Sequence, residues 1–321
     1  MAAIRRVALV GSGALGVACL EGLIKAGFKV TALTRSRTKF EKYSKDVEIK
    51  ELEYLDPSSL AELKRTFEYQ DAVVSVVAPA AIMAQQPLIE AAAEAGIKHI
   101  IPSTFASMGG DSAARHLPGY DQIHELQDWL IARSSRTQDT NRMTWTTVNN
   151  GAFMDLVLNY PFLADFPNHR ATLWDSGDNK LSCTTYPTIA RAVVGILRNY
   201  TSAACKNRWV NVHDIALSQN MVLDMAKKAD PSSHWDVDAH LDTAKVLDQS
   251  LATYRAQRGS GNTVWAHGDT LVHTLLTSAV MSGRYKTNYE GDLQNEELGV
   301  PEFTLEDLYG LVTMRTRGEM V

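Results

Sequence analysis

Short apolar runs alternate with amphipathic stretches through the first half of the chain. The runs that predict strands are Val7–Val10, Phe28–Thr34, Val47–Tyr54, Asp71–Val77, Lys98–Pro102 and Thr144–Val148. The stretches that predict helices are Ala14–Ala26, Ser58–Phe67, Ala81–Ala95 and Tyr120–Ala132. Because the run from Asp71 to Val77 is almost entirely apolar, it is typical of a central strand in a parallel sheet. The alternation predicts an α/β fold, a doubly wound parallel sheet with helices on both faces.

The pattern changes in the second half. A helix over Thr184–Asn199 and a strand at Trp209–Val212 continue the alternation, whereas helical segments dominate after Ser218. Two polar stretches interrupt the elements: Thr104–Pro118, which contains two glycines, and the insertion Ser134–Arg142. The first predicts either a mobile loop over a site or a solvated connection.

A glycine-rich turn after the first strand indicates what this fold binds. The first strand runs directly into Gly11, Gly13 and Gly16, and a helix follows that ends at Gly27. In a strand–turn–helix context, Gly-x-Gly-x-x-Gly predicts dinucleotide binding. The first glycine would make the tight turn, the second would let the backbone approach a pyrophosphate, and the third would let helix and strand pack closely. The helix N-terminus would then hold the anion.

We therefore expect two regions. Residues 1–150, with 184–215 returning to them, would form a Rossmann-type dinucleotide-binding domain. Residues 151–183 and 216–321 would form a smaller, mainly helical substrate-binding region. The apolar side chains that would line a substrate pocket there are Phe153, Met154, Phe162 and Trp174.

Charge at the end of the second strand favours NADP(H) over NAD(H). The residues after Thr34 include Arg35, Arg37 and Lys39, and no acidic residue occurs between Gly27 and Glu41. Sites that prefer NAD place an acid there for the ribose 2′-hydroxyl, whereas an arginine accommodates the 2′-phosphate. Arg35 is the strongest candidate, and the alternative is a solvated basic loop.

Other cofactor-binding candidates follow the strands. The glycine turn contributes Gly11, Ser12, Gly13, Ala14, Leu15 and Gly16. Asp56 follows the third strand, where it would reach the adenine or cap the helix before Pro57. Ala78 and Pro79 end the fourth strand, and Asn150 follows the sixth, where it would orient the nicotinamide or form a turn with Gly151.

The composition excludes several classes of protein. Of the 321 residues, 45% are hydrophobic and 21% charged, which is typical of a globular protein. Nucleic-acid binding is not expected, because the net charge is −5 and the basic residues form no run. No apolar stretch approaches the roughly 20 residues of a membrane span. We expect a small-molecule substrate and a monomer or homodimer.

The N-terminus and the cysteines indicate a cytoplasmic setting. Arg5 and Arg6 before an apolar run resemble a signal peptide, but cleavage there would remove the first strand and the glycine turn. The three cysteines, Cys19, Cys183 and Cys205, are far apart. They form neither a disulfide framework nor a metal-binding spacing, so we expect a reducing compartment and no metal.

Several stretches resemble the NmrA-like and isoflavone-reductase-like branch of the atypical short-chain dehydrogenases. They are Gly11–Gly16, Leu33–Ser36, Gln86–Gly96, Ile97–Phe105 and Trp145–Phe153, with weaker echoes in Asp178–Ser182 and Asn207–Asn211. The resemblance covers residues 4 to about 215. It implies a Rossmann-type domain, NADPH, and often reduction of aromatic or phenylpropanoid-like metabolites, which in fungal members belongs to secondary metabolism. Some members bind the dinucleotide and regulate without catalysis.

The chain departs from this family at one position. The isoflavone-reductase group carries a lysine on the helix after the Pro-Ser loop, and its ammonium organises the ribose and assists proton transfer. Here the helix Gly119–Leu130 contains no lysine, and the position falls at Gln122, Ile123 or His124.

Tyr120 and His124 are the alternative candidates for proton transfer. Four residues apart, they would share one helix face. A cationic imidazole would lower the pKa of a neighbouring tyrosine, and histidine itself donates protons near neutral pH. Ser103 would hold a substrate oxygen.

Three functions fit the sequence. The first is an NADPH-dependent reductase of a small, largely apolar carbonyl, enone or benzylic compound. The second is a dinucleotide sensor, which the missing lysine favours. The third is a non-redox isomerase or lyase on the same fold.

Overall fold

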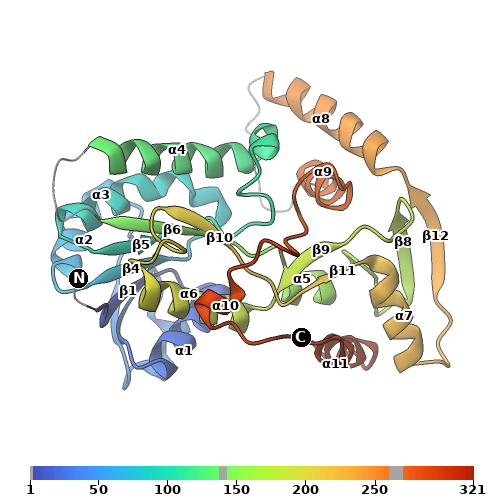
Figure 1. Cartoon of the computed structure of the whole chain (residues 1–321), viewed down its shortest axis with the longest axis horizontal. Helices are drawn as coiled ribbons and strands as arrows, with labels where there is room; N and C mark the ends of the chain where they lie inside the picture. Colours follow the sequence, from blue (N-terminus) through green and yellow to red (C-terminus); the bar gives the residue numbers. More distant parts are fainter. Residues whose placement is uncertain (1–2, 137–142, 260–269) are drawn as a thin grey trace.

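The main unit of the molecule is a parallel sheet. The computed structural model describes residues 3–136, 143–259 and 270–321, and within them seven strands pair in the order β10-β6-β5-β4-β1-β2-β3 (Figure 1). These strands are β1 Arg6–Val10, β2 Lys29–Thr34, β3 Glu48–Glu51, β4 Ala72–Ser75, β5 His99–Ile101, β6 Thr144–Asn149 and β10 Arg208–Asn211. Every pair is parallel, which confirms the doubly wound α/β prediction.

Helices cover both faces of this sheet. The helices are α1 Ala14–Lys25, α2 Leu60–Phe67, α3 Gln86–Glu94, α4 Tyr120–Arg136 and α6 Tyr186–Asn199. In β1 the side chains of Val7 and Leu9 join a core that includes residues of α1 and α6. Ala8 and Val10 point the other way, into a core that includes residues of α2, α3 and α4. The period of two along a strand therefore places one layer of helices on each face.

Most of the remaining elements form the other end of the molecule, on the right of Figure 1, whereas α10 (Asn295–Leu298) packs against α6. The strands are β7 Ala152–Phe153, β8 Arg170–Trp174, β9 Leu181–Thr184, β11 Ile215–Leu217 and β12 Asp236–Leu241. The helices are α5 Met154–Asn159, α7 Gln219–Ala229, α8 Thr243–Gly259, α9 Thr270–Met281, α10 Asn295–Leu298 and α11 Leu305–Thr316. Two small sheets, β11-β9-β7 and β12-β8, accompany the predicted helices.

Several boundaries differ from the prediction. The helix expected from Ala81 begins as α3 at Gln86, after two short 3₁₀ turns, and the helix expected from Thr184 begins as α6 at Tyr186. The short 3₁₀ helices are Arg37–Lys39, Glu41–Tyr43, Pro57–Ser59, Pro79–Ala81, Met83–Gln85 and Ser112–His116. The insertion expected over Ser134–Arg142 is helical as far as Arg136, and residues 137–142 lie outside the described part of the chain.

The stretch Thr104–Pro118 is not a solvated connection. Met108, Ala114 and Leu117 are at most 1% exposed and belong to the main apolar core. The side chain of Gln127 on α4 donates to the Gly109 carbonyl at 3.1 Å. The loop is therefore packed between α4 and the carboxyl edge of the sheet.

Candidate functional site

The glycine turn has the geometry that the sequence predicts. Gly11 has a φ of 110°, and its N–H donates to the Leu33 carbonyl at the end of β2 over 3.0 Å. A Cβ at Gly11 would lie 2.6 Å from the Val76 carbonyl oxygen, and one at Gly16 would lie 2.5 Å from the Gly11 carbonyl oxygen. The turn therefore excludes side chains at both positions, because β4 and α1 approach the backbone closely.

Gly13 is open instead of crowded. A Cβ there would meet no atom within 4 Å, and Gly13 and Ala14 are exposed while Leu15 is half-buried. No side chain caps α1, and its first turn contains no acidic residue. The first N–H groups of a helix lack intrahelical partners and carry partial positive charge. The residues present thus fit a pyrophosphate, which would occupy the open side of Gly13.

The end of β2 lies beside this turn. The hydroxyls of Thr34 and Ser12 hydrogen-bond at 2.9 Å, and Arg35 follows as an exposed residue. Arg35 lies beside the Tyr54 phenol, where its charge opposes the rise in pKa that burial gives Tyr54. Arg35 thus directly follows the strand residue that contacts the glycine turn.

Arg37 is already engaged. Its Nε pairs with the Glu41 carboxylate at 3.3 Å, and its Nη1 donates to the Ile49 carbonyl at 3.3 Å. Its backbone N–H donates to the Glu51 carboxylate at 2.8 Å. Lys39 is exposed on the same 3₁₀ helix. Arg37 therefore has partners within the protein, whereas Arg35 and Lys39 are both exposed.

Asp56 has the capping role that the sequence offered as one alternative. Its carboxylate accepts from the Ser58 N–H at 2.8 Å, and this backbone hydrogen bond holds the pKa of Asp56 below its usual value. Ala78 and Pro79 are exposed where β4 ends, at the start of a short 3₁₀ helix. They lie at the carboxyl edge of the sheet, where ligands bind in such folds.

Ser103 and Asn150 are both buried at this edge. The Ser103 hydroxyl donates to the Val77 carbonyl at 2.9 Å, so in this structure it joins the ends of β4 and β5 and does not present itself to a substrate. The Asn150 amide donates to the Gly151 carbonyl at 3.0 Å. Within the described residues, its Oδ1 has no hydrogen-bond partner although it is buried.

The expected cationic Tyr120–His124 pair is not what the structure contains. Tyr120 is 8% exposed, its hydroxyl lies 2.9 Å from the Ser107 hydroxyl, and burial raises its pKa. His124 is 2% exposed, and burial, followed by the charge of Arg115, lowers its pKa. Both groups are therefore neutral at pH 7, and the tyrosine proton is held more tightly than in water. The imidazole Nε2 has no hydrogen-bond partner among the described residues.

A tyrosine from the far end of the chain completes this cluster. Tyr289 is 2% exposed and donates its hydroxyl to the Ser107 carbonyl, so Ser107 lies between two phenols. The backbone N–H of Lys286 donates to the Asp111 carboxylate at 2.8 Å and fixes the same segment. No short-range pattern marks Tyr289, because its partner is 182 residues away.

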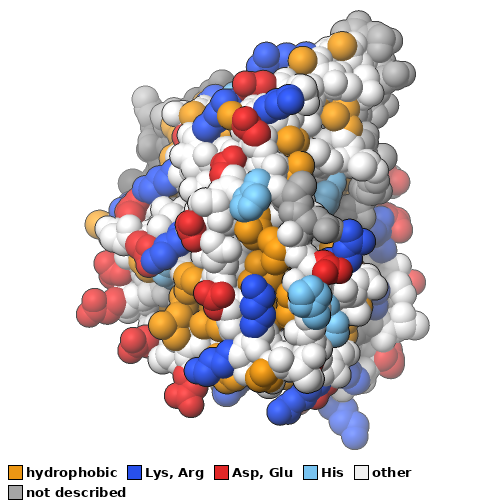
Figure 2. Space-filling view, turned by 90° about the vertical axis from the view of Figure 1, so that its right-hand side faces the viewer, with side chains coloured by type: hydrophobic (Ala, Val, Ile, Leu, Met, Phe, Trp, Pro, Cys, Tyr) orange, Lys and Arg blue, Asp and Glu red, His pale blue; other side chains and the backbone are white. Residues whose placement is uncertain are grey.

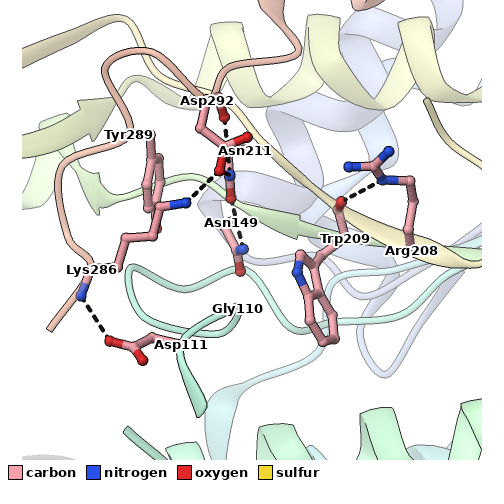
Figure 3. A pocket seen from close by; sticks show the side chains of 9 residues that line it. All are labelled: Gly110, Asp111, Asn149, Arg208, Trp209, Asn211, Lys286, Tyr289 and Asp292. Carbon is pink, nitrogen blue, oxygen red and sulfur yellow. Dashed lines mark hydrogen bonds and ion pairs between the residues drawn. The ribbon is translucent and has the colours of Figure 1, made fainter. Parts of the chain in front are cut away.

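A small polar cavity of about 80 Å³ opens where β6 and β10 end (Figure 3). The Asn149 amide donates to Asn211 at 2.9 Å, and Asn211 donates to the Asp292 carbonyl at 3.0 Å. Lys286 points into the cavity and pairs with the Asp292 carboxylate. Because the lining amides and charges satisfy one another, this cavity suits a few waters or one polar substituent.

The described residues contain no cluster of metal ligands, and their cysteines are free thiols. No group of three or more His, Cys, Asp or Glu side chains that could hold a metal occurs among residues 3–136, 143–259 and 270–321. The free cysteines are Cys19, Cys183 and Cys205, and all are buried. Burial raises the pKa of Cys19 to about 12, so its thiolate is scarce.

In the described part of the chain, no helix is long and apolar enough to cross a membrane.

The chain matches a known protein family and two named oxidoreductases. The model of the NmrA-like family matches residues 5–230. Oxidoreductase poxI of Penicillium oxalicum is 31% identical over 217 residues, which cover 66% of this chain and 66% of that protein. Oxidoreductase aprR of Aspergillus flavus is 29% identical over 213 residues, 66% of this chain and 68% of that protein. The match to poxI thus spans just under two thirds of each chain.

Solved structures share the fold over nearly the whole chain. Leucoanthocyanidin reductase of Vitis vinifera, in complex with NADPH, has a TM-score of 0.73 at 15% identity, over 96% of this chain and 99% of that one. An isoflavone reductase has a TM-score of 0.70 at 16% identity, over 95% and 98%. An NADPH-dependent quinone oxidoreductase of Escherichia coli, complexed with NADPH, has a TM-score of 0.68 at 18% identity, over 95% and 98%. At these identities the similarity establishes the fold.

Proposed function

This chain belongs to the NmrA-like family, and on that premise we propose that it is an NADP(H)-dependent reductase. Its substrate would be a small, largely apolar carbonyl, enone or benzylic compound. The observation that carries the proposal is the open Gly13 face beside Arg35, at the end of a strand without a terminal acid. The names of the fungal relatives and the NADPH-bound structural neighbours support it.

Each part of the carboxyl edge has a task in this proposal. The N–H groups of the first turn of α1 would hold the pyrophosphate, and Arg35 would pair with the 2′-phosphate through its planar guanidinium. The bound nicotinamide supplies the hydride. Asn150, with its unpaired buried oxygen, would accept a hydrogen bond from the cofactor or the substrate.

The proton would come from the cluster at the start of α4. Tyr120 is the proposed donor: its proton would pass to the developing oxyanion, the Ser107 hydroxyl at 2.9 Å would donate a hydrogen bond to the phenolate left behind, and water would reprotonate that phenolate after product release. His124 is the second candidate, because its neutral ring keeps one nitrogen without a partner in the described residues. A tyrosine with a raised pKa still donates to a developing oxyanion that is more basic than itself.

Nucleotide titration of Arg35→Ala tests the cofactor assignment. Removing a charge-assisted hydrogen bond costs about 1.5–3 kcal/mol, so the Kd for NADPH should rise by roughly 10- to 100-fold. The Kd for NADH should stay unchanged, because NADH lacks the 2′-phosphate. Arg65→Ala, an exposed arginine on α2, controls for net charge and should leave both values unchanged. If the wild type binds neither nucleotide, the proposed function is wrong.

A regulator that binds NADP(H) without turnover is the second candidate. The burial of both Tyr120 and His124 favours it, because a buried donor reaches a substrate only if the site opens.

Variants at α4 separate the two functions. In a reductase, Tyr120→Phe should lower the rate of substrate-dependent NADPH oxidation by about 10²- to 10⁴-fold, with the Kd for NADPH unchanged. His124→Gln identifies the donor, since only the variant of the true donor loses that rate. A screen of aromatic enones that detects no oxidation by the wild type, with NADPH bound tightly, would favour the regulator.

A further inference from the structure

A second, larger cavity lies at the end of the molecule opposite the glycine turn. Its volume is about 340 Å³, and it is lined by residues 161–165, by β8, by Leu241 at the end of β12 and by α9. None of these elements belongs to the seven-stranded sheet. In Figure 1 they lie on the right, whereas α1 lies on the left.

The floor of this cavity is buried and mostly apolar. Leu163, Ala171, Trp174 and Thr277 line it, and each is at most 8% exposed. Phe162 adds a second, half-buried aromatic ring. Two of the four side chains that the sequence suggested for a substrate pocket, Phe162 and Trp174, therefore meet here. Met154 is instead core, and Phe153 packs on Tyr186 with ring centroids 5.5 Å apart.

The rim is polar and carries both signs of charge. Asp165 and Arg170 lie there beside the exposed His273 on α9. Figure 2, which looks onto this end of the molecule, shows hydrophobic side chains in a central band with histidine and charged side chains beside it. Because the charges are mixed, the rim suits a group that both donates and accepts hydrogen bonds better than a net charge.

We propose that this cavity is a binding site for a flat, largely apolar phenol. Ligand pockets are typically about 300–1,000 Å³, with apolar walls and a few polar groups that fix orientation. The aromatic rings of Trp174 and Phe162 would pack against the aromatic body, and the rim would take the hydroxyl. The site is separate from the cofactor edge and does not depend on the proposed reductase activity.

The probe is 2-naphthol, titrated by quenching of tryptophan fluorescence. Thr277→Phe fills the floor and should weaken binding at least tenfold, whereas Thr253→Phe, the same change on the exposed surface of α8, should leave the Kd unchanged. The far-ultraviolet circular dichroism spectrum should be the same in both variants, which shows that the fold is intact. Equal 2-naphthol affinity in Thr277→Phe and the wild type would overturn the proposal.

Two further measurements test the same binding site. If Thr277→Phe does not fold, the exposed His273→Ala should weaken 2-naphthol binding several-fold by removing a rim partner. An unchanged Kd in His273→Ala would then overturn the assignment. Saturating NADPH should leave the 2-naphthol Kd of the wild type unchanged, and competition between them would place the probe at the cofactor edge instead.

Discussion

At the scale of single residues, the three motif glycines serve different purposes. Gly11 and Gly16 are needed by the protein itself, because a Cβ at either would collide with backbone within 2.6 Å. Gly13 has no such neighbour and adopts an extended conformation, with φ −69° and ψ −177°, that any residue tolerates. As the N-cap of α1, Gly13 also leaves the open side of the turn free for a ligand.

Alanine at Gly13 and at Gly16 should therefore have opposite effects. Gly13→Ala should lower the free energy of unfolding by no more than about 1 kcal/mol, the cost of alanine at an N-cap, yet weaken NADPH binding at least tenfold. Gly16→Ala should lower the free energy of unfolding by about 1–3 kcal/mol, because α1 must move away from the turn. Urea unfolding and nucleotide titration of both variants measure this. An NADPH affinity that survives in Gly13→Ala would place the pyrophosphate elsewhere.

At the scale of elements, strand pairing depends on buried polar side chains as well as on the backbone. His99 at the start of β5 hydrogen-bonds Thr144 at 2.7 Å and Thr146 at 3.1 Å, both on β6. Its ring packs against Tyr200 with centroids 5.7 Å apart. Burial lowers the pKa of His99 to about 3, so the folded protein keeps this ring neutral.

The buried, neutral His99 ring predicts that the protein loses stability in acid. The folded state holds His99 neutral down to about pH 3, whereas the unfolded chain protonates it below its ordinary pKa of 6.5. The unfolded state thus binds more protons below pH 6.5. The stability that neutral His99 contributes is fully present above pH 6.5, and as the pH falls the free energy of unfolding decreases by up to about 1.4 kcal/mol per pH unit. His99→Gln should show a shallower dependence of unfolding free energy on pH between 6.5 and 4.

At the scale of the whole molecule, the two predicted regions share one core. A single cluster of buried side chains contains Val10 and Leu33 of the large sheet together with Trp174, Leu247 and Leu308 from the other end. The division into residues 1–150 with 184–215, and 151–183 with 216–321, remains a prediction about function. Because the core is shared, we expect each part to depend on the other for stability.

Unfolding should accordingly be one cooperative transition. Far-ultraviolet circular dichroism and tryptophan fluorescence should give the same urea midpoint, because both report on the same apolar core. NADPH at about 100 times its Kd should raise the free energy of unfolding by about 2.7 kcal/mol in both signals. Two separate transitions, of which NADPH shifts only one, would show that the regions fold independently.

The sequence by itself determined the parallel sheet, the glycine turn and the position of Arg35. These depend on the periods of hydrophobic residues and on turn chemistry, which act over a few neighbouring residues. The same local reasoning missed β8 and β12 and left two alternatives open for Thr104–Pro118, because a partner strand or a covering helix is not visible along the chain.

The tertiary structure alone decided the chemical state of the site. Helix spacing placed Tyr120 and His124 on one face, but burial makes both neutral and so removes the expected imidazolium. Tyr289 reaches Ser107 from 182 residues away, and the cavity at Trp174 needs α9 to close it. Protonation and cavity shape follow from desolvation and packing between distant segments, and no pattern of neighbouring residues encodes either.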